Sequence, residues 1–325
     1  MNEMAQSPDT PESQQDWQEN LRQIGAKEGF FEELGAEHSA LYIQRGRTLI
    51  VTFENLDHVF ENACDRMPWG YDFVSKRGWS MLGLMAHDWT WYRDKDVFDF
   101  FDRLRDEGFF QGFDKVIFYG ASMGAYAAAV FSAAAPGSTV ICISPQATLA
   151  RNVTSWETRY KKAWRRDFSS RYAYGPDQVR LARSVYLFFD PTASLDAMHA
   201  ALFRGPNVQK FSCRYFGHRI ASLWLQLGIL KPVIIDCVEG TLTRTNFYTY
   251  LRARHENPRY QKEMLQRLQE MDKPYLLIRF CRAVLERRRG PAFRKALREA
   301  EERVAEAEAR MAKRGKLVKA TEKKA

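Results

Sequence analysis

The feature that most constrains the fold is a short turn, Gly120-Ala121-Ser122-Met123-Gly124, between two segments of different character. The run 115–119 before it is apolar and strand-like, and the run 125–135 after it is alanine-rich and helix-like. Gly120 and Gly124 remove side chains where the backbone must turn sharply and pack closely. Ser122 is therefore expected at a helix N-terminus, beside free backbone N–H groups that can stabilise an oxyanion. This context predicts that Ser122 is a nucleophile.

Strand-like and helix-like segments alternate along the middle of the chain. Apolar, β-branched runs predict strands at 40–43, 48–53, 80–85, 115–119, 139–144, 185–189 and 209–216. Helical periodicity or composition predicts helices at 96–108, 125–135, 195–203 and 220–227. Such alternation implies parallel strands joined by crossover helices. We therefore expect an α/β fold with a doubly wound, mostly parallel sheet.

Composition divides the chain into several regions. We predict a polar N-terminal arm at 1–35, an α/β domain at 36–240 with a lid-like helical insertion at 151–183, a helical C-terminal extension at 241–312 and a disordered basic tail at 313–325.

The net charge of +9 is concentrated in two of these regions. Residues 282–325 hold 15 Lys/Arg against 7 Glu, and residues 151–183 hold 9 Lys/Arg against 3 Asp/Glu. The basic C-terminal helix is interpreted either as a solvated helix or as one that contacts a partner or an anionic surface.

The insertion at 151–183 combines aromatic and basic side chains. A Thr154–Glu157 capping box predicts a helix start. Aromatic residues recur every four positions at Trp156, Tyr160, Trp164 and Phe168, and the other side carries Arg159, Lys162, Arg165 and Arg166. The aromatic stripe either packs on the sheet domain or forms an amphipathic lid over the site that favours an anionic substrate or surface.

Several classes of protein are disfavoured. No run approaches the roughly 18 apolar residues of a membrane span, and the polar N-terminus has no export signal.

The five cysteines, Cys64, Cys142, Cys213, Cys237 and Cys281, are scattered and odd in number. Free thiols in a reducing cytoplasm are therefore favoured over metal ligands. No phosphate-binding glycine loop or specific nucleic-acid motif occurs, and no cofactor or metal is expected.

A serine nucleophile needs a base and an orienting acid. His218 follows the last expected strand in Phe216-Gly217-His218, where parallel sheets place their active sites. Two carboxylates precede it as candidate acids: Asp190 ends a strand, and Asp196 lies at an expected helix start. Both remain open. His87 precedes Ser122 in the chain and is interpreted as a pocket or core histidine.

The order nucleophile, acid, histidine, each at a strand end, resembles the α/β-hydrolase superfamily over roughly residues 39–235. The resemblance implies a doubly wound sheet and a Ser-His-Asp triad that acts on an ester, thioester or amide. It implies one oxyanion donor at the backbone N–H of Met123 and a second in the loop after an early strand, at Asn55 or Leu56. The His-Gly-Gly string of lipases is absent from that loop.

These observations predict a cytoplasmic serine hydrolase, of the carboxylesterase or deacylase kind, that cleaves an acyl bond in a small-molecule or acylated substrate through an acyl-enzyme. One alternative is an acyltransferase with the same triad. Another is a catalytically silent protein of this fold that binds a partner through its basic helical tail.

Overall fold

The computed structural model describes residues 11–55 and 67–322. The chain divides into two compact units, the first ending at Leu251 and the second beginning at Arg252. Leu56 and Cys64 lie outside the described residues.

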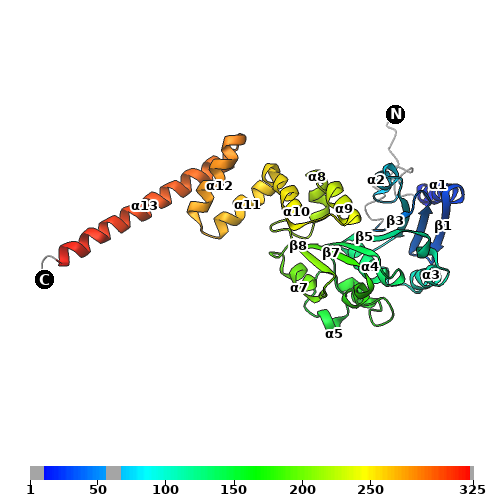
Figure 1. Cartoon of the computed structure of the whole chain (residues 1–325). Helices are drawn as coiled ribbons and strands as arrows, with labels where there is room; N and C mark the ends of the chain where they lie inside the picture. Colours follow the sequence, from blue (N-terminus) through cyan, green and yellow to red (C-terminus); the bar gives the residue numbers. More distant parts are fainter. Residues whose placement is uncertain (1–10, 56–66, 323–325) are drawn as a thin grey trace, which may run out of the picture. The chain divides into compact units, whose positions relative to one another are not determined.

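The first unit is built on one eight-stranded sheet (Figure 1). In chain order the strands are β1 (Gly29–Leu34), β2 (His38–Ile43), β3 (Thr48–Asn55), β4 (Ser80–Ala86), β5 (Lys115–Ala121), β6 (Thr139–Ile143), β7 (Ser184–Phe189) and β8 (Val208–Ser212). Their order across the sheet is β1-β2-β4-β3-β5-β6-β7-β8. Among the pairings of these described strands, β1–β2 and β2–β4 are antiparallel and the others are parallel. The prediction of an α/β fold with a mostly parallel sheet is confirmed.

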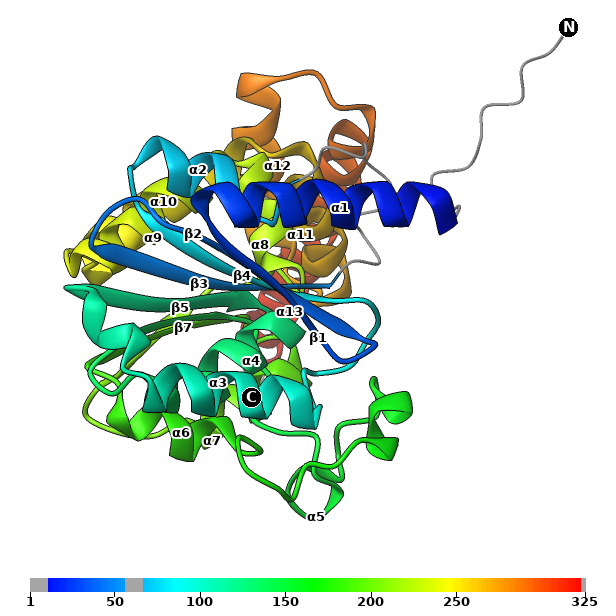
Figure 2. The ribbon, with the colours of Figure 1, turned by 90° about the vertical axis from the view of Figure 1, so that its right-hand side faces the viewer.

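Helices cover both faces of the sheet, as Figure 2 shows. One face carries α3 (Lys95–Asp106), α4 (Met123–Phe131), α6 (Gly175–Gln178) and α7 (Ser194–Leu202). The other carries α1 (Pro11–Glu28), α2 (Tyr71–Lys76), α8 (Ile220–Gln226), α9 (Leu230–Glu239) and α10 (Arg244–Leu251). Double coverage explains why the central strands are almost continuously apolar, because both of their faces are buried.

Helix α4 lies at the centre of the core. Every residue from Met123 to Phe131 is buried. Its many alanines allow it to pack close to β3, β5 and β6. Helix α3, by contrast, is amphipathic: Val97, Phe101 and Leu104 are buried, and Asp94 caps its start by accepting a hydrogen bond from the Asp96 N–H.

The N-terminal segment differs from the predicted polar arm. Its described part forms helix α1 and edge strand β1. Trp17 and Leu21 of α1, four residues apart, pack against Leu41 and Met85 of the sheet. These two anchors lie within residues 17–24, where the sequence indicates a short helix, and the observed helix is longer.

The insertion at 151–183 is not the single helix that the aromatic periodicity predicted. It contains only short pieces, α5 (Arg151–Thr154), the 3-10 turns η4 (Lys161–Arg165) and η5 (Val179–Leu181), and α6. The Thr154 hydroxyl donates to the Thr148 carbonyl and does not form the expected capping box. Tyr160 packs against Trp91, whereas Trp164 lies under Arg151, so the aromatic side chains have separate partners.

The second unit is helical. It contains η6 (Arg252–Glu256), α11 (Pro258–Glu270), α12 (Pro274–Arg287) and α13 (Pro291–Glu322). Its own apolar cluster includes Leu265, Leu277, Cys281 and Phe293. Helix α13 extends across most of 313–325, for which the sequence predicts disorder.

Within the described ranges, no individual helix has the length and apolar character of a membrane span. The pair α8 and α9 reaches that length only when the two are joined, and they meet at an angle of 110°.

Candidate active site

Ser122 occupies a strained turn between β5 and α4. Its backbone angles are φ 52° and ψ −119°, a conformation unfavourable for a residue with a side chain. The turn is close-packed: a Cβ on Gly120 would overlap the Gly124 backbone, and a Cβ on Gly124 would overlap the Phe53 carbonyl. Only glycine fits at these two positions, which explains the spacing of the motif.

Other residues with positive φ lie at the same edge of the sheet. Trp91 and Tyr92 follow β4, Ser144 follows β6 and Tyr215 follows β8, with φ between 49° and 68°. Backbone strain tends to gather at functional sites, where the surrounding structure maintains it. The carboxyl ends of the parallel strands thus form the candidate active site.

Three polar side chains form a continuous row at this edge. The Ser122 Oγ lies 2.8 Å from the His218 Nε2. The His218 Nδ1 lies 2.9 Å and 3.0 Å from the two carboxylate oxygens of Asp196. A proton on Nδ1, donated to the carboxylate, leaves Nε2 free to accept from the serine hydroxyl.

The structure separates the two candidate acids. Asp196 is buried in the first turn of α7 and points to the imidazole. Asp190 is also buried, but it accepts hydrogen bonds from the Thr192 N–H and hydroxyl and, at 2.7 Å, from the Gly217 N–H. Asp190 therefore stabilises the loop that carries His218 through a backbone hydrogen bond, whereas Asp196 contacts the imidazole.

The insertion supplies a cation to Asp196. The Arg159 Nη1 donates to the Asp196 Oδ1 over 2.7 Å. Burial acts to raise the pKa of Asp196, but the His218 and Arg159 contacts outweigh it and hold that pKa below its ordinary value. Asp196 is thus an anion at neutral pH.

Arg159 also binds a second buried carboxylate, Glu157. Its Nε and Nη2 donate to the Glu157 oxygens at 3.1 Å and 2.6 Å. The His199 Nε2 lies 3.0 Å from the same carboxylate, and the His199 Nδ1 accepts from the Ala147 N–H. Against the effect of burial, these contacts lower the pKa of Glu157 to about 2.

Tyr160, the residue after Arg159, reaches the imidazole of His218. Its hydroxyl oxygen lies 3.2 Å from the His218 Nε2. Its ring packs against Trp91, with centroids 4.9 Å apart, and lies under the Arg159 guanidinium. The insertion therefore contributes side chains to the site from two consecutive residues.

The structure describes two of the three predicted oxyanion donors, Met123 and Asn55. Met123 is the first residue of α4, so its N–H precedes the first hydrogen bonds within the helix, from Ala125 and Tyr126 to the Ser122 carbonyl. Asn55 ends β3, the strand next to β5. Leu56 falls in the stretch that the structure does not describe.

His87 lies away from the row of three. It follows β4, and its Nε2 is 3.5 Å from the Ser39 Oγ on β2. Burial lowers the pKa of His87, so it is neutral at pH 7.

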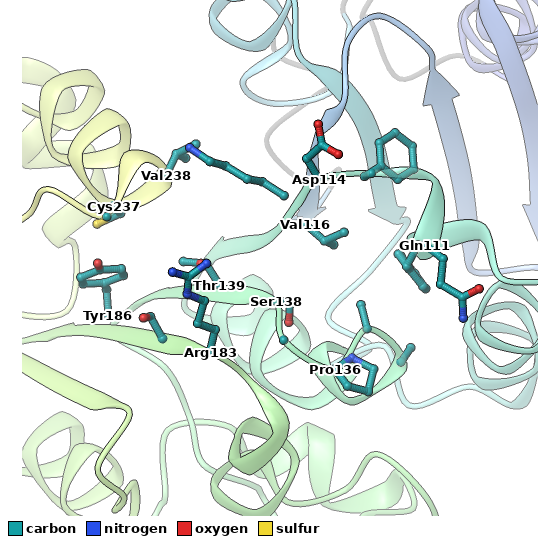
Figure 3. A pocket seen from close by; sticks show the side chains of 18 of the residues that line it. Gln111, Asp114, Val116, Pro136, Ser138, Thr139, Arg183, Tyr186, Cys237 and Val238 are labelled. Carbon is teal, nitrogen blue, oxygen red and sulfur yellow. The ribbon is translucent and has the colours of Figure 1, made fainter.

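The largest cavity described lies at the opposite ends of the strands. It has a volume of about 760 Å³ and is lined by the starts of β5, β6 and β7 and the end of α9, with Ser138, Thr139 and Arg183 among its residues (Figure 3). Of its charged groups, Lys115 pairs with Glu239 at 2.7 Å. The polar row lies at the other edge and does not line this cavity.

No metal centre is indicated in the described part of the chain. It contains no group of three or more His, Cys, Asp or Glu side chains placed to hold a metal ion. Cys142, Cys237 and Cys281 are buried free thiols, and Cys213 is buried as well.

The fold brings together the serine turn and the two polar residues that follow it along the chain. A strained serine joins a central parallel strand to a buried helix, and an aspartate and a histidine follow in that order at the same sheet edge. The chain resembles the α/β-hydrolase superfamily in fold.

Comparison of this hydrolase-like fold with solved structures gives distant neighbours. The capsule O-acetyltransferase of Neisseria meningitidis serogroup A is 14% identical with a TM-score of 0.41, over 63% of this chain and 93% of that chain. An esterase of Pyrobaculum calidifontis is 15% identical with a TM-score of 0.42, over 73% and 95%. An esterase of Pyrococcus furiosus is 13% identical with a TM-score of 0.41, over 62% and 86%. No protein-family model matches the chain, and no curated protein matches it.

The sequence does not predict the contacts of Glu157, Arg159, Tyr160 and His199. It predicts Glu157 in a capping box and Arg159 on the basic side of a helix. Their contacts join residues 157–160 to residues 37 to 58 positions away, a separation for which local spacing gives no signal.

Proposed function

We propose that the chain is a serine hydrolase that cleaves an ester or related acyl bond through a Ser122-His218-Asp196 triad. The observation that carries the proposal is the unbroken row of hydrogen bonds, 2.8 Å from Ser122 to His218 and 2.9 Å from His218 to Asp196. The strained turn supports it, because it holds the hydroxyl at the sheet edge beside a helix N-terminus.

In this proposal His218 acts as general base. Its Nε2 takes the Ser122 proton while the Oγ attacks the carbonyl carbon, and the carbonyl oxygen becomes an oxyanion. The Met123 N–H stabilises that charge. Asp196, an anion, stabilises the imidazolium.

Collapse of the tetrahedral intermediate completes acylation. His218 gives its proton to the leaving group, and the acyl group remains on Ser122. Water then attacks the acyl-enzyme with His218 again as base, which releases the acid and restores Ser122. An alcohol in the place of water would make the same acyl-enzyme an acyltransferase intermediate.

We also propose that the substrate is an anionic small molecule or acylated compound. The exposed cations Lys161, Lys162 and Arg165 belong to η4, which directly follows Tyr160. Other cations of the insertion are engaged elsewhere: Arg166 pairs with Glu37, and Arg171 pairs with Asp102. The η4 cations are therefore the ones best placed to attract a negative group.

Turnover of p-nitrophenyl acetate tests the hydrolase proposal. Ser122→Ala should lower kcat by about 10⁴-fold or more, since the nucleophile is lost. Ser138→Ala is the control, because Ser138 is also buried but lines the cavity at the opposite ends of the strands. It should keep kcat within about threefold. Equal activity of a folded Ser122→Ala variant and the original chain would refute the proposal.

A further inference from the structure

Arg159 connects the proposed triad to a second buried carboxylate. One arm of its guanidinium binds Asp196, and the other two nitrogens bind Glu157. Both carboxylate side chains have no exposed surface, and the Arg159 side chain is 27% exposed. Three charges are therefore held together beside the imidazole and largely out of water.

The charges of this cluster have opposing effects on His218. If Asp196 were its one anionic partner, the Arg159 guanidinium would cancel the charge of that carboxylate. It would then disfavour the imidazolium that catalysis requires. Glu157 offsets that cation with two contacts of its own. The imidazole then faces a net charge close to that of Asp196 alone.

We infer that Arg159 and Glu157 are a charge-compensated positioning pair: Arg159 fixes the carboxylate of Asp196, and Glu157 cancels the charge that Arg159 brings. The inference rests on the proposed function, because it assigns these residues to the triad acid. It gives the insertion an electrostatic task beside Asp196.

The other groups near His218 do not compensate the cation. The Ser122 and Tyr160 hydroxyls on its Nε2 side are neutral, and the pKa of Tyr160 is raised by burial. His199, on α7, contacts Glu157, and burial lowers its pKa.

Two further charged groups, one carboxylate and one guanidinium, lie near His218. Asp190 is bonded to the Gly217 N–H, and Arg219, the residue after His218, is exposed. Among the described residues, two carboxylates pair with Arg159. One is Asp196, and the other, which compensates the cation, is Glu157.

The test is the titration of the His218 imidazole in the full-length protein, followed by NMR of histidine-labelled samples. The His218 signal is assigned by its loss in His218→Asn. Removing the cation in Arg159→Gln should raise the titration midpoint by about one pH unit, because two buried anions then favour the imidazolium. Removing the anion in Glu157→Gln should lower the midpoint by a similar amount.

The double variant Arg159→Gln/Glu157→Gln decides between charge and packing. It removes one charge of each sign, so its midpoint should return to within about 0.3 units of the original value. If either single variant fails to fold, Arg159→Lys is measured instead. Because it keeps the charge, its midpoint should move by less than half of the shift of about one unit predicted for Arg159→Gln.

Shifts in the same direction in both single variants, or no shift above 0.3 units in any variant, would overturn the inference. A double variant that stays displaced would do the same. The readout does not depend on turnover, so loss of the proposed function is recognised separately, by a chain whose Ser122 does not react with a fluorophosphonate.

Discussion

At the scale of the residue, Asp190 and Asp196 are both buried, and only their partners distinguish them. Asp196 contacts the imidazole of His218, and Asp190 accepts a hydrogen bond from the backbone N–H of Gly217, directly before that histidine. Asp196→Asn should lower kcat by about 10⁴-fold, because the amide favours the wrong histidine tautomer. Asp190→Asn should cost less than about 100-fold, together with about 1–3 kcal/mol of unfolding free energy. Parallel kinetics and urea unfolding of the two variants check this prediction, and a larger kcat loss in Asp190→Asn would reverse the assignment.

Glu157 provides a prediction on acid stability. Its pKa falls from 4.5 to about 2 on folding, through its contacts with His199 and Arg159 and in spite of burial. A folded-state pKa below the unfolded value means that the carboxylate stabilises the fold above pH 4.5 and that this contribution is lost as the pH falls toward 2. The contribution is on the order of 3 kcal/mol.

The comparison variant is Glu157→Gln. It should be less stable than the original chain at pH 6, and the difference in unfolding free energy should shrink steadily between pH 5 and pH 2. Denaturant unfolding at a series of pH values measures it. A difference that is constant across that range would show that Glu157 contributes no ionic stabilisation.

At this scale, local patterns in the sequence, a glycine-flanked turn and a strand-end histidine, point to Ser122 and His218 as partners. The structure places the Ser122 Oγ 2.8 Å from the His218 Nε2. The acid could not be chosen, since two carboxylates follow the same strand and only α7 decides which of them faces the imidazole. Glu157, Arg159 and Tyr160 reach His199, Asp196 and His218 through long-range contacts that leave no local pattern.

At the scale of the element, the turn η4 carries the prediction on substrate charge. Lys161→Glu/Lys162→Glu should raise KM for a p-nitrophenyl ester with a free carboxylate several-fold and change KM for p-nitrophenyl acetate much less. The effect should weaken in 0.5 M salt, where the screening length falls to a few ångströms. Lys231→Glu, on the exposed side of α9, is the matched control and should affect neither ester. Equal effects on both esters at all salt concentrations would leave η4 without a role in substrate choice.

The strands of the sheet other than edge strand β1 were predictable for a physical reason. Strands buried on both faces are continuous apolar runs, and amphipathic α3 shows its period clearly. The insertion was not predictable, because its four-residue aromatic spacing mimics a helix while its polar contacts to Asp196 and Glu37 hold the chain in turns. Strand β8 is also shorter than expected and ends at Ser212, before the loop that carries His218.

At the scale of the whole molecule, the proposed triad and the sheet belong to the first unit, and the helices from Arg252 onward have their own apolar cluster. A chain cut after Leu251 should therefore fold and keep kcat/KM for p-nitrophenyl acetate within about twofold. Circular dichroism melting and ester turnover measure this. A cut chain that is folded but inactive would show that the second unit contributes to the reaction.

The boundary between the units lies beyond the one that composition predicts, at 240. Helix α10 belongs to the first unit because Phe247 is buried against Phe188, Phe211 and Trp224. A change in composition marks where charge increases, whereas the boundary depends on which apolar side chains share a core. Contact of the basic C-terminal helix with a partner or an anionic surface stays a prediction.

The central claim is that Ser122 is activated by His218 and Asp196, and covalent labelling tests it most directly. A fluorophosphonate reacts only with an activated serine, and peptide mass spectrometry locates the adduct. The account predicts one adduct, on Ser122, that is absent from acid-unfolded protein and from His218→Ala. A folded chain that forms no adduct, or forms it on another serine, would contradict the account.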